Sequence, residues 1–338
     1  MKILVTGSAG FIGNHVSLRL LKEGHEVVGV DNLNPYYDVN LKHRRIERLT
    51  PYDNYINVPI DINDHVKLNK VFEKYKISQI IHLAAQAGVR HSLTAPRDYI
   101  DSNVLGFLNI LEACRNYSIG HLIYASTSSV YGGNTKMPFS EHHSTNHPKN
   151  LYAAVKKANE LMAHSYSHLF NYPVTGLRFF TVYGPWGRPD MALFKFTKAI
   201  LNNEPIDLYN NGDMKRDFTY IDDIVEGIVR TLANPPEIDI DWNSNQPDPA
   251  TSGLAPYQVF NIGNNQPVHL IKLVEILEKI LGRTALKNYM PMQAGDVETS
   301  WASSDELIKK IGYSPATSIE EGLQSFVGWY LDYFKIKI

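Results

Sequence analysis

The chain has almost no cysteine and no long apolar run, and each absence excludes a class of protein. A single cysteine, Cys114, among 338 residues excludes an intramolecular disulfide and is typical of a reducing compartment. No apolar run approaches the roughly 18 residues that a membrane-spanning helix needs. The first residues lead into the short run Ile3–Val5 and then into glycines, which does not predict a signal peptide. We therefore expect a soluble, cytoplasmic protein.

An excess of charge of either sign is also missing. The 33 Lys and Arg residues are balanced by 35 Asp and Glu residues, which leaves a net charge of −2 at pH 7. This balance gives no electrostatic reason to expect nucleic acid or a membrane surface as partner. His142, His143 and His147 have no second ligand set at zinc-like spacing, so we expect no metal site.

The first half of the chain alternates short apolar runs with amphipathic stretches. This alternation is typical of βαβ units and predicts a parallel sheet. We expect strands at Lys2–Thr6, Glu26–Asp31, Gln79–Ala84, Leu122–Ser126 and Val174–Phe179, and helices at Gly13–Lys22, Asn103–Arg115 and Tyr152–His168. After about residue 180 we expect longer loops and helices, with a polar surface segment at 234–256 and helices at His269–Leu281 and Ile319–Tyr333. The organisation predicts an α/β head over residues 1–180, to which later segments return, and a smaller lobe over residues 181–338.

A glycine-rich turn follows the first expected strand and opens the first expected helix. It reads Thr6-Gly7-Ser8-Ala9-Gly10-Phe11-Ile12-Gly13. Glycines here allow a tight turn and let the main chain approach a pyrophosphate at a helix N-terminus. Asp31 ends the second expected strand, where a carboxylate accepts hydrogen bonds from an adenosine ribose and repels a 2′-phosphate. The sequence therefore predicts NAD rather than NADP, with Gly7, Gly10, Phe11, Ile12, Gly13 and Asp31 at the site.

Two more strand ends carry candidates for dinucleotide contacts. Asp61 and Ile62 follow a third short apolar run, and they either contact an adenine or form a simple turn. The segment His82–Arg90 ends the next strand in small residues, which leaves room for a cofactor or for close helix–sheet packing. His82 itself is expected to be a packed core residue.

A tyrosine and a lysine four residues apart, Tyr152 and Lys156, begin a predicted helix. The spacing places both side chains on one helix face, where a cation can hold a phenol close to its anionic form and make it a base. The same spacing at Tyr333 and Lys337 is ascribed to chance. What distinguishes Tyr152 is a strand that ends upstream in Ala125-Ser126-Thr127-Ser128-Ser129, at the edge where open α/β sheets bind ligands. These hydroxyls either cap the backbone or contact a substrate, and the nearby Tyr152 favours the second role.

The glycine turn, the hydroxyl-rich strand end and the Tyr152/Lys156 pair resemble the extended short-chain dehydrogenase/reductase family, specifically its NAD-dependent nucleotide-sugar epimerases and dehydratases. The segments most similar to UDP-glucuronate 4-epimerases are His82–Arg90, Val130–Asn134, Arg178–Met191, Met214–Phe218, Asp248–Thr251 and Met292–Val297. The resemblance covers essentially the whole chain. It implies a Rossmann-type doubly wound parallel sheet with a smaller, mixed C-terminal substrate lobe, and a homodimer that pairs through the helices near Asn103–Arg115 and Tyr152–His168.

The resemblance also implies roles for individual residues. Tyr152 would be the base that oxidises a UDP-sugar at C4, with NAD kept bound. Lys156 would lower the phenol pKa and bind the nicotinamide ribose, and Thr127 aligns with the family's catalytic hydroxyl. The further cofactor contacts that it implies are Asn32, Asp61, Ile62, Leu83, Ala84, Ala85, Asn103, Ser126 and Phe179. The substrate contacts are Arg90, Thr127, Ser128, Ser129, Thr181, Arg188, Arg216 and Asp296.

Missing carboxylates favour one reaction type within this group. Ser128 and Ser129 stand where related dehydratases carry an Asp-Glu pair and where related decarboxylases carry a Glu. Plain epimerisation needs neither acid.

A 4-keto-uronate tends to lose carbon dioxide, so its carboxylate must be anchored. Arg188 is the candidate cation, because a guanidinium grips a carboxylate at two points, although it could be a surface-loop arginine. Thr181 stands where UDP-glucose epimerases usually have Asn, and it would leave room for that carboxylate.

The diphosphate and nucleoside contacts are also implied by the resemblance. Arg216 would pair with the UDP pyrophosphate, Asp296 would face the uridine ribose, and Arg90 would lie near the diphosphate or the sugar. Gln293 lies near where other epimerases supply a second phosphate-binding arginine. The expected function is the 4-epimerisation of UDP-glucuronate to UDP-galacturonate. The alternatives are a 4-epimerase for neutral or N-acetylated UDP-hexoses and a catalytically silent, NAD-binding interaction protein.

Overall fold

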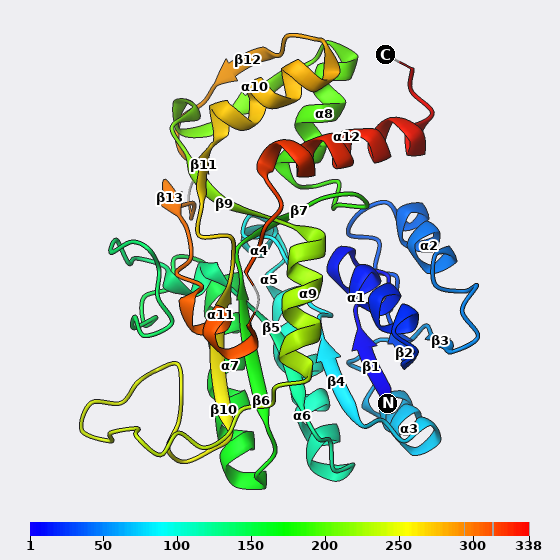
Figure 1. The fold of residues 1–338 in the computed structure, drawn as a ribbon, viewed down its shortest axis with the longest axis vertical. Helices are drawn as coiled ribbons and strands as arrows, with labels where there is room; N and C mark the ends of the chain where they lie inside the picture. Colours follow the sequence, from blue (N-terminus) through cyan, green and yellow to red (C-terminus); the bar gives the residue numbers. More distant parts are fainter. Residues whose placement is uncertain (294, 313, 338) are drawn as a thin grey trace.

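A parallel sheet of seven strands forms the centre of the computed structural model, which describes residues 1–293, 295–312 and 314–337 (Figure 1). The strand order is β10-β6-β5-β4-β1-β2-β3, and every hydrogen-bonded pair is parallel. The bounds are β1 Lys2–Thr6, β2 Glu26–Val30, β3 Tyr55–Val58, β4 Gln79–His82, β5 Leu122–Thr127, β6 Val174–Phe179 and β10 Tyr257–Ile262. The chain winds outward in both directions from the boundary between β1 and β4, where open α/β sheets bind ligands. The predicted doubly wound parallel sheet is confirmed.

Helices cover both faces of this sheet because its strands alternate their side chains between two apolar layers. Leu4 of β1 joins the layer under α3, α6 and α7, whereas Ile3 and Val5 join the layer under α1, α9 and α11. The bounds are α1 Phe11–Lys22, α3 His65–Tyr75, α6 Gly106–Asn116, α7 Leu151–Phe170, α9 Ile221–Leu232 and α11 Asp305–Ile311. Figure 1 shows α1 and α9 side by side across one face. Strands buried on both faces are typical of parallel sheets.

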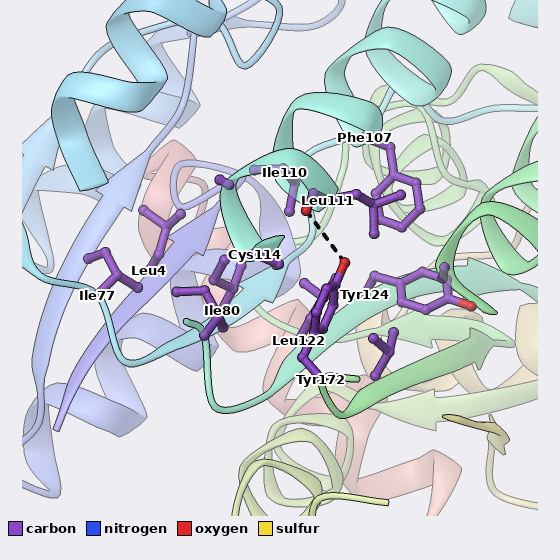
Figure 2. Close-up of a cluster of buried hydrophobic side chains, with 14 of the residues drawn as sticks. Leu4, Ile77, Ile80, Phe107, Ile110, Leu111, Cys114, Leu122, Tyr124 and Tyr172 are labelled. Carbon is purple, nitrogen blue, oxygen red and sulfur yellow. Dashed lines mark hydrogen bonds between the residues drawn. The ribbon is translucent and has the colours of Figure 1, made fainter. Parts of the chain in front are cut away.

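Figure 2 shows part of the first layer at the centre of the sheet. Leu4, Ile80 and Leu122 come from three adjacent strands and pack with Phe107 of α6. The lone cysteine, Cys114, is 1% exposed in this layer, and burial raises the pKa of its thiol. A reactive role for this cysteine is therefore not supported by its surroundings.

A smaller second lobe packs above the carboxyl ends of the large sheet (Figure 1). Its helices are α8 Ala192–Asn202, α10 Leu270–Leu281 and α12 Ile319–Phe334, which share one apolar cluster. The short strands are β7 Thr181–Tyr183, β8 Pro205–Leu208, β9 Lys215–Tyr220, β11 Pro267–His269, β12 Leu286–Tyr289 and β13 Thr299–Ser300. The expectation of loops and helices after residue 180 was therefore incomplete, because strands of two to six residues show little alternation in the sequence.

The remaining elements are short or irregular. They are α2 Val39–Glu47, α4 His91–Thr94, α5 Pro96–Ile100, the π-helix η1 Asp101–Leu105, and the 3-10 helices η2 Ser128–Tyr131 and η3 Tyr209–Gly212. The helix predicted at Asn103–Arg115 is thus split into η1 and α6. Residues 233–256 contain no helix or extended strand, as the polar composition predicted, and they form the long loop at the lower left of Figure 1. None of the helices, over the residues that the structure describes, is long and apolar enough to cross a membrane.

Candidate active site

A cavity of about 300 Å³ lies along the carboxyl ends of the central strands. It is lined by the glycine turn between β1 and α1, by the ends of β2, β4 and β5, and by the start of α7. All but one of the predicted cofactor residues line it. They are Gly7, Gly10, Phe11, Ile12, Gly13, Asp31, Asn32, Asp61, Ile62, Leu83, Ala84, Ala85, Ser126, Tyr152, Lys156 and Phe179. The predicted cofactor residues therefore lie together at one place in the fold.

The exception is Asn103, which lies behind the cavity wall. Its side-chain amide accepts from the Gln86 N–H at 2.8 Å and donates to the Gln86 carbonyl oxygen at 2.9 Å. Asn159 of α7 donates to the Asn103 carbonyl oxygen at 2.6 Å. Asn103 thus fixes the chain that follows β4, and it does not form the wall itself.

The glycine turn has the shape that a pyrophosphate requires. A Cβ atom on Gly13 would overlap the carbonyl oxygen of Gly7, and one on Gly7 would lie 2.9 Å from the nitrogen of Ala84. Helix α1 begins after Gly10 without a side-chain cap, so the amides of its first turn have no such partner. Asp31 accepts hydrogen bonds from the N–H groups of Ala9 and Leu33, which fixes its carboxylate at the end of β2. These features fit a dinucleotide.

A second cavity, of about 710 Å³, opens between the large sheet and the smaller lobe. All the predicted substrate residues line it: Arg90, Thr127, Ser128, Ser129, Thr181, Arg188, Arg216 and Asp296. Thr127, Tyr152 and Arg188 line both cavities, whereas Lys156 lines only the smaller one. Tyr152 therefore lies where a ligand in one cavity would meet a ligand in the other.

The surroundings of Tyr152 act on the pKa of its phenol in both directions. Burial raises the pKa of its phenol, while Thr127, through a hydrogen bond, and the charge of Arg188 act in the opposite direction. The lowering of the Tyr152 pKa by Lys156 stays a prediction. Burial lowers the pKa of Lys156 itself to about 8, against the charge of Glu160. Tyr99 packs edge-on against the Tyr152 ring, with centroids 6.0 Å apart, and helps to fix its orientation.

A buried ion pair joins α7 to β6, and a hydrogen bond from Ser126 at the end of β5 completes it. Arg178 donates to both carboxylate oxygens of Glu160 at 2.9 Å, and both side chains are at most 1% exposed. Ser126, which lines the smaller cavity, donates to the same carboxylate at 2.7 Å. Burial opposes ionisation of Glu160, but Arg178, Lys157 and Ser126 outweigh it and lower its pKa to about 2. This network fixes the strand end that carries Thr127 relative to the helix that carries Tyr152.

Arg188 is already engaged by a carboxylate of this chain. Its Nε and Nη2 donate to the two carboxylate oxygens of Asp190 at 3.0 and 2.5 Å. Burial opposes the charge of Arg188, but Asp190 outweighs it and raises the arginine's pKa. The hydroxyl of Tyr36 also approaches Asp190, at 3.4 Å. Arg188 was predicted as the cation for a carboxylate of the ligand, and its pairing with Asp190, two residues further along the chain, was not predicted.

The other basic residues of the larger cavity differ in how they are held. Arg216 donates to the carbonyl oxygens of Val297 and Glu298, at 2.6 and 2.9 Å. Burial lowers the Arg216 pKa, against the charge of Asp296. Arg90 pairs with Asp296 at 3.3 Å. Arg216 is therefore a desolvated cation held mainly by carbonyl oxygens, which suits an anionic ligand.

The comparison with known proteins agrees with this geometry. The family described as the NAD dependent epimerase/dehydratase family matches residues 3–245. The chain belongs to the NAD dependent epimerase/dehydratase family. It is 55% identical to Protein CapI of Staphylococcus aureus over 335 residues, which cover 99% of this chain and 100% of that protein. It is 52% identical to a probable UDP-glucuronate 4-epimerase of Rhizobium meliloti (strain 1021) over 333 residues, 98% of this chain and 97% of the relative.

A solved structure of an epimerase is also similar to this chain. The UDP-glucuronic acid 4-epimerase from Bacillus cereus, in complex with UDP-glucuronic acid and NAD, superposes with a TM-score of 0.86 at 32% identity, over 98% of this chain and 100% of the other. Membership of the NAD dependent epimerase/dehydratase family confirms the predicted Rossmann fold and the predicted NAD cofactor. It also confirms the resemblance to the extended short-chain dehydrogenase/reductases.

Sequence reasoning missed several side chains of the epimerase/dehydratase site, among them three that lie between β2 and α2 or within α2. Tyr36, Tyr37 and Lys42 line the smaller cavity. Lys42 donates to the carbonyl oxygen of Asn34 at 2.7 Å, and its amine lies 4.9 Å from the centre of the Tyr37 ring. The run Asn34-Pro35-Tyr36-Tyr37-Asp38 reads as a polar turn, and its aromatic pair was the one available signal.

Proposed function

We propose that this protein interconverts UDP-glucuronate and UDP-galacturonate by NAD-dependent epimerisation at C4. The observation that carries the proposal is the position of Tyr152 and Thr127 on the wall shared by the two cavities, beside Ser128 and Ser129. The relative from Rhizobium meliloti and the Bacillus cereus structure with UDP-glucuronic acid and NAD support this substrate.

The reaction follows from what the side chains of the shared wall can do. Bound NAD supplies the acceptor, and later the donor, of a hydride at C4 of the sugar. Tyr152 would take the proton of the C4 hydroxyl and return it after the 4-keto sugar has turned over in the larger cavity. Thr127, which hydrogen bonds to the phenol, would hold the C4 oxygen in line with it. Lys156, which lines only the smaller cavity, would bind the nicotinamide ribose.

The acidic groups of the larger cavity argue against elimination and decarboxylation. Its carboxylates, among the residues that the structure describes, are Asp190, Asp207 and Asp296. Each is engaged: Asp190 with Arg188, Asp207 with Asn288 at 2.8 Å, and Asp296 with Arg90. None is placed as a free acid or base at the end of β5. A reversible C4 epimerisation needs only Tyr152.

The charge of the larger cavity favours an anionic sugar nucleotide. Five Lys or Arg residues and three Asp residues line its described part, an excess of two positive charges: Arg90, Lys149, Arg188, Lys195 and Arg216 against Asp190, Asp207 and Asp296. The two negative charges of a diphosphate would balance this excess, and a uronate carboxylate would add a third negative charge.

Individual contacts complete the proposal. We assign the pyrophosphate to Arg216 and the uridine ribose to Asp296, with Arg90 near the diphosphate. The hydroxyls of Ser128, Ser129 and Thr181 would receive the uronate carboxylate. Because Asp190 already neutralises Arg188, this arginine would orient the carboxylate more than neutralise it. In this division the large sheet, including β10, binds NAD, and residues 181–338 mainly bind the UDP-sugar.

The proposal includes a homodimer and a cytoplasmic location. Large apolar side chains are exposed on α5, η1 and α7, among them Ile100 at 42%, Leu105 at 49%, Leu161 at 62% and Leu169 at 64%. Helices α6 and α7 are packed neighbours, so a second copy could cover this face with a four-helix contact. We expect Leu161→Glu to convert a dimer into a monomer in light scattering. A wild-type monomer at micromolar concentration would contradict the assignment. Cell fractionation tests the location.

The substrate assignment is tested with purified protein and UDP-glucuronate. NMR should detect the C4 epimer at equilibrium without added NAD, with the C5 hydrogen retained in deuterated water and without UDP-pentose. A Tyr152→Phe variant is the matched control and should bind UDP-glucuronate but convert it about 10²–10⁴-fold more slowly. Sustained release of carbon dioxide, or conversion of UDP-glucose but not of UDP-glucuronate, would refute the assignment.

A further inference from the structure

One buried arginine, Arg45 of α2, has no part in the roles assigned above. Its side chain is fully buried. Nε and Nη2 donate to the carbonyl oxygen of Trp186 at 3.2 and 2.6 Å, and Nη2 also donates to that of Gly187 at 3.2 Å. Nη1 donates to the carbonyl oxygen of Ala9 at 3.0 Å and to the hydroxyl of Tyr37 at 2.7 Å. Every N–H group of the guanidinium thereby has an acceptor.

These hydrogen bonds join two segments that are far apart in the sequence. Ala9 lies in the glycine turn of the smaller cavity, and its N–H donates to Asp31 at 3.1 Å. Trp186 and Gly187 lead directly into Arg188, which lines both cavities and pairs with Asp190. One planar group therefore links the turn proposed for the pyrophosphate of NAD to the loop that lies over the sugar.

The backbone conformation of Trp186 indicates that its surroundings hold this residue in place. Its φ angle is +63°, in the left-handed region that a residue with a Cβ rarely adopts unless its surroundings hold it there. Arg45 holds its carbonyl oxygen. The guanidinium of Arg48 lies 4.9 Å from the centre of its ring, and the Trp329 ring of α12 lies 5.4 Å away. Figure 1 shows the chain between β7 and α8 passing between α2 and α12.

The chemistry of Arg45 is unusual for a buried cation. No carboxylate of the described residues is hydrogen bonded to it, and burial lowers its pKa, against the influence of Tyr37 and Asp31. A buried charge without an ionic partner is unfavourable. An apolar side chain could fill the same space but could not tie three carbonyl oxygens together. We infer that Arg45 acts here through the rigid, planar arrangement of its N–H donors rather than through its charge.

We propose that Arg45 is a positioning residue that couples the glycine turn to the segment 186–190, so that NAD and the UDP-sugar strengthen each other's binding. The inference rests on the function proposed above. Coupling between two ligands is reciprocal, and a typical factor is about 5–150. The loss of Arg45 would leave both cavities intact but would remove the rigid link between them.

The test compares Arg45→Met, Arg45→Lys and the control Arg44→Met. Arg44 is the preceding residue on α2, is 62% exposed and pairs only with Glu47 among the described residues. The affinity for NAD is measured with and without saturating UDP, and the steady-state constants are measured with UDP-glucuronate. For the wild type and Arg44→Met we expect saturating UDP to lower the Kd of NAD at least about fivefold. For Arg45→Met we expect the ratio of the two Kd values, without and with UDP, to fall to near one. The KM of this variant should rise about tenfold, with a smaller change in kcat. Arg45→Lys should lie between them, because an ammonium lacks the planar fork.

The outcomes separate this inference from the proposed function. A wild-type ratio near one, or an unchanged ratio and KM in Arg45→Met, would overturn the role of Arg45. Should Arg45→Met fail to fold, Arg45→Lys decides, since wild-type coupling and KM in that variant would equally overturn it. A wild type that couples NAD to UDP but does not epimerise UDP-glucuronate would refute the proposed substrate and leave the coupling standing.

Discussion

The buried pair of Glu160 and Arg178 gives the sharpest prediction for the scaffold of the site. Glu160→Gln keeps the shape of the side chain and an acceptor for Ser126, but it sets an amide donor against Arg178 and removes the carboxylate that pairs with that guanidinium. Removing one partner of a buried pair costs about 3–5 kcal/mol. The pKa of Glu160 gives a similar figure, since a fall from 4.5 to about 2 corresponds to roughly 3 kcal/mol.

The contribution of Glu160 to the free energy of unfolding depends on pH in a definite direction. Because the folded-state pKa of Glu160 lies below its unfolded value, the stabilisation is fully present above about pH 4.5 and is lost as the pH falls towards 2. Reversible urea unfolding should therefore give a variant about 3–4 kcal/mol less stable at pH 7. The difference in free energy of unfolding between the wild type and Glu160→Gln should decrease by about 1.4 kcal/mol for each pH unit below 4.5.

An exposed pair supplies the control for this measurement. Glu47 pairs with Arg44 at 2.8 Å while its side chain is 57% exposed, so Glu47→Gln should cost less than about 1 kcal/mol. A Glu160→Gln variant that loses less than about 1 kcal/mol at pH 7, or whose deficit is the same at pH 3.5, would refute the reasoning.

Three further predictions concern single side chains. Tyr152→Phe should lower kcat by about 10²–10⁴-fold with little change in KM, because only proton transfer is removed; a kcat within tenfold of the wild type would show that another group is the base. Gly13→Ala should weaken NAD binding by about tenfold or more, because the new Cβ would meet the carbonyl oxygen of Gly7; NAD released from heat-denatured protein measures this, and full occupancy would contradict it. Burial raises the pKa of Glu141 to about 7, against the hydrogen bond from Asn261, so its ionisation destabilises the fold as the pH rises from about 4.5 to 7. Glu141→Gln should therefore be neutral near pH 4.5 and stabilising by up to roughly 3 kcal/mol at pH 8 in urea unfolding, and an equal effect at both pH values would contradict this.

The sequence predicted the large sheet well because local and long-range signals agree there. The five expected strands begin at the predicted residues and end within two residues of the predicted ends. Strand β10 was missed, since it follows a long polar loop and nothing local shows that it returns to β6. The site residues next to glycine and hydroxyl motifs were brought together as expected. Arg45 was missed because its role depends on backbone carbonyl oxygens, which carry no signal in a side-chain pattern.

The pair of Tyr152 and Lys156 shows why spacing alone is a weak argument. Tyr333 and Lys337 have the same spacing, but α12 ends at Phe334 and Lys335 takes a left-handed conformation, so Lys337 cannot share a helix face with Tyr333. Helix α7 begins at Leu151 and continues far past Lys156. Burial raises the pKa of the Tyr152 phenol there, and Thr127 and Arg188 oppose the effect of burial. If Tyr152 is the base at neutral pH, then positive potential from Lys156 and from bound ligands must lower the pKa of its phenol during turnover.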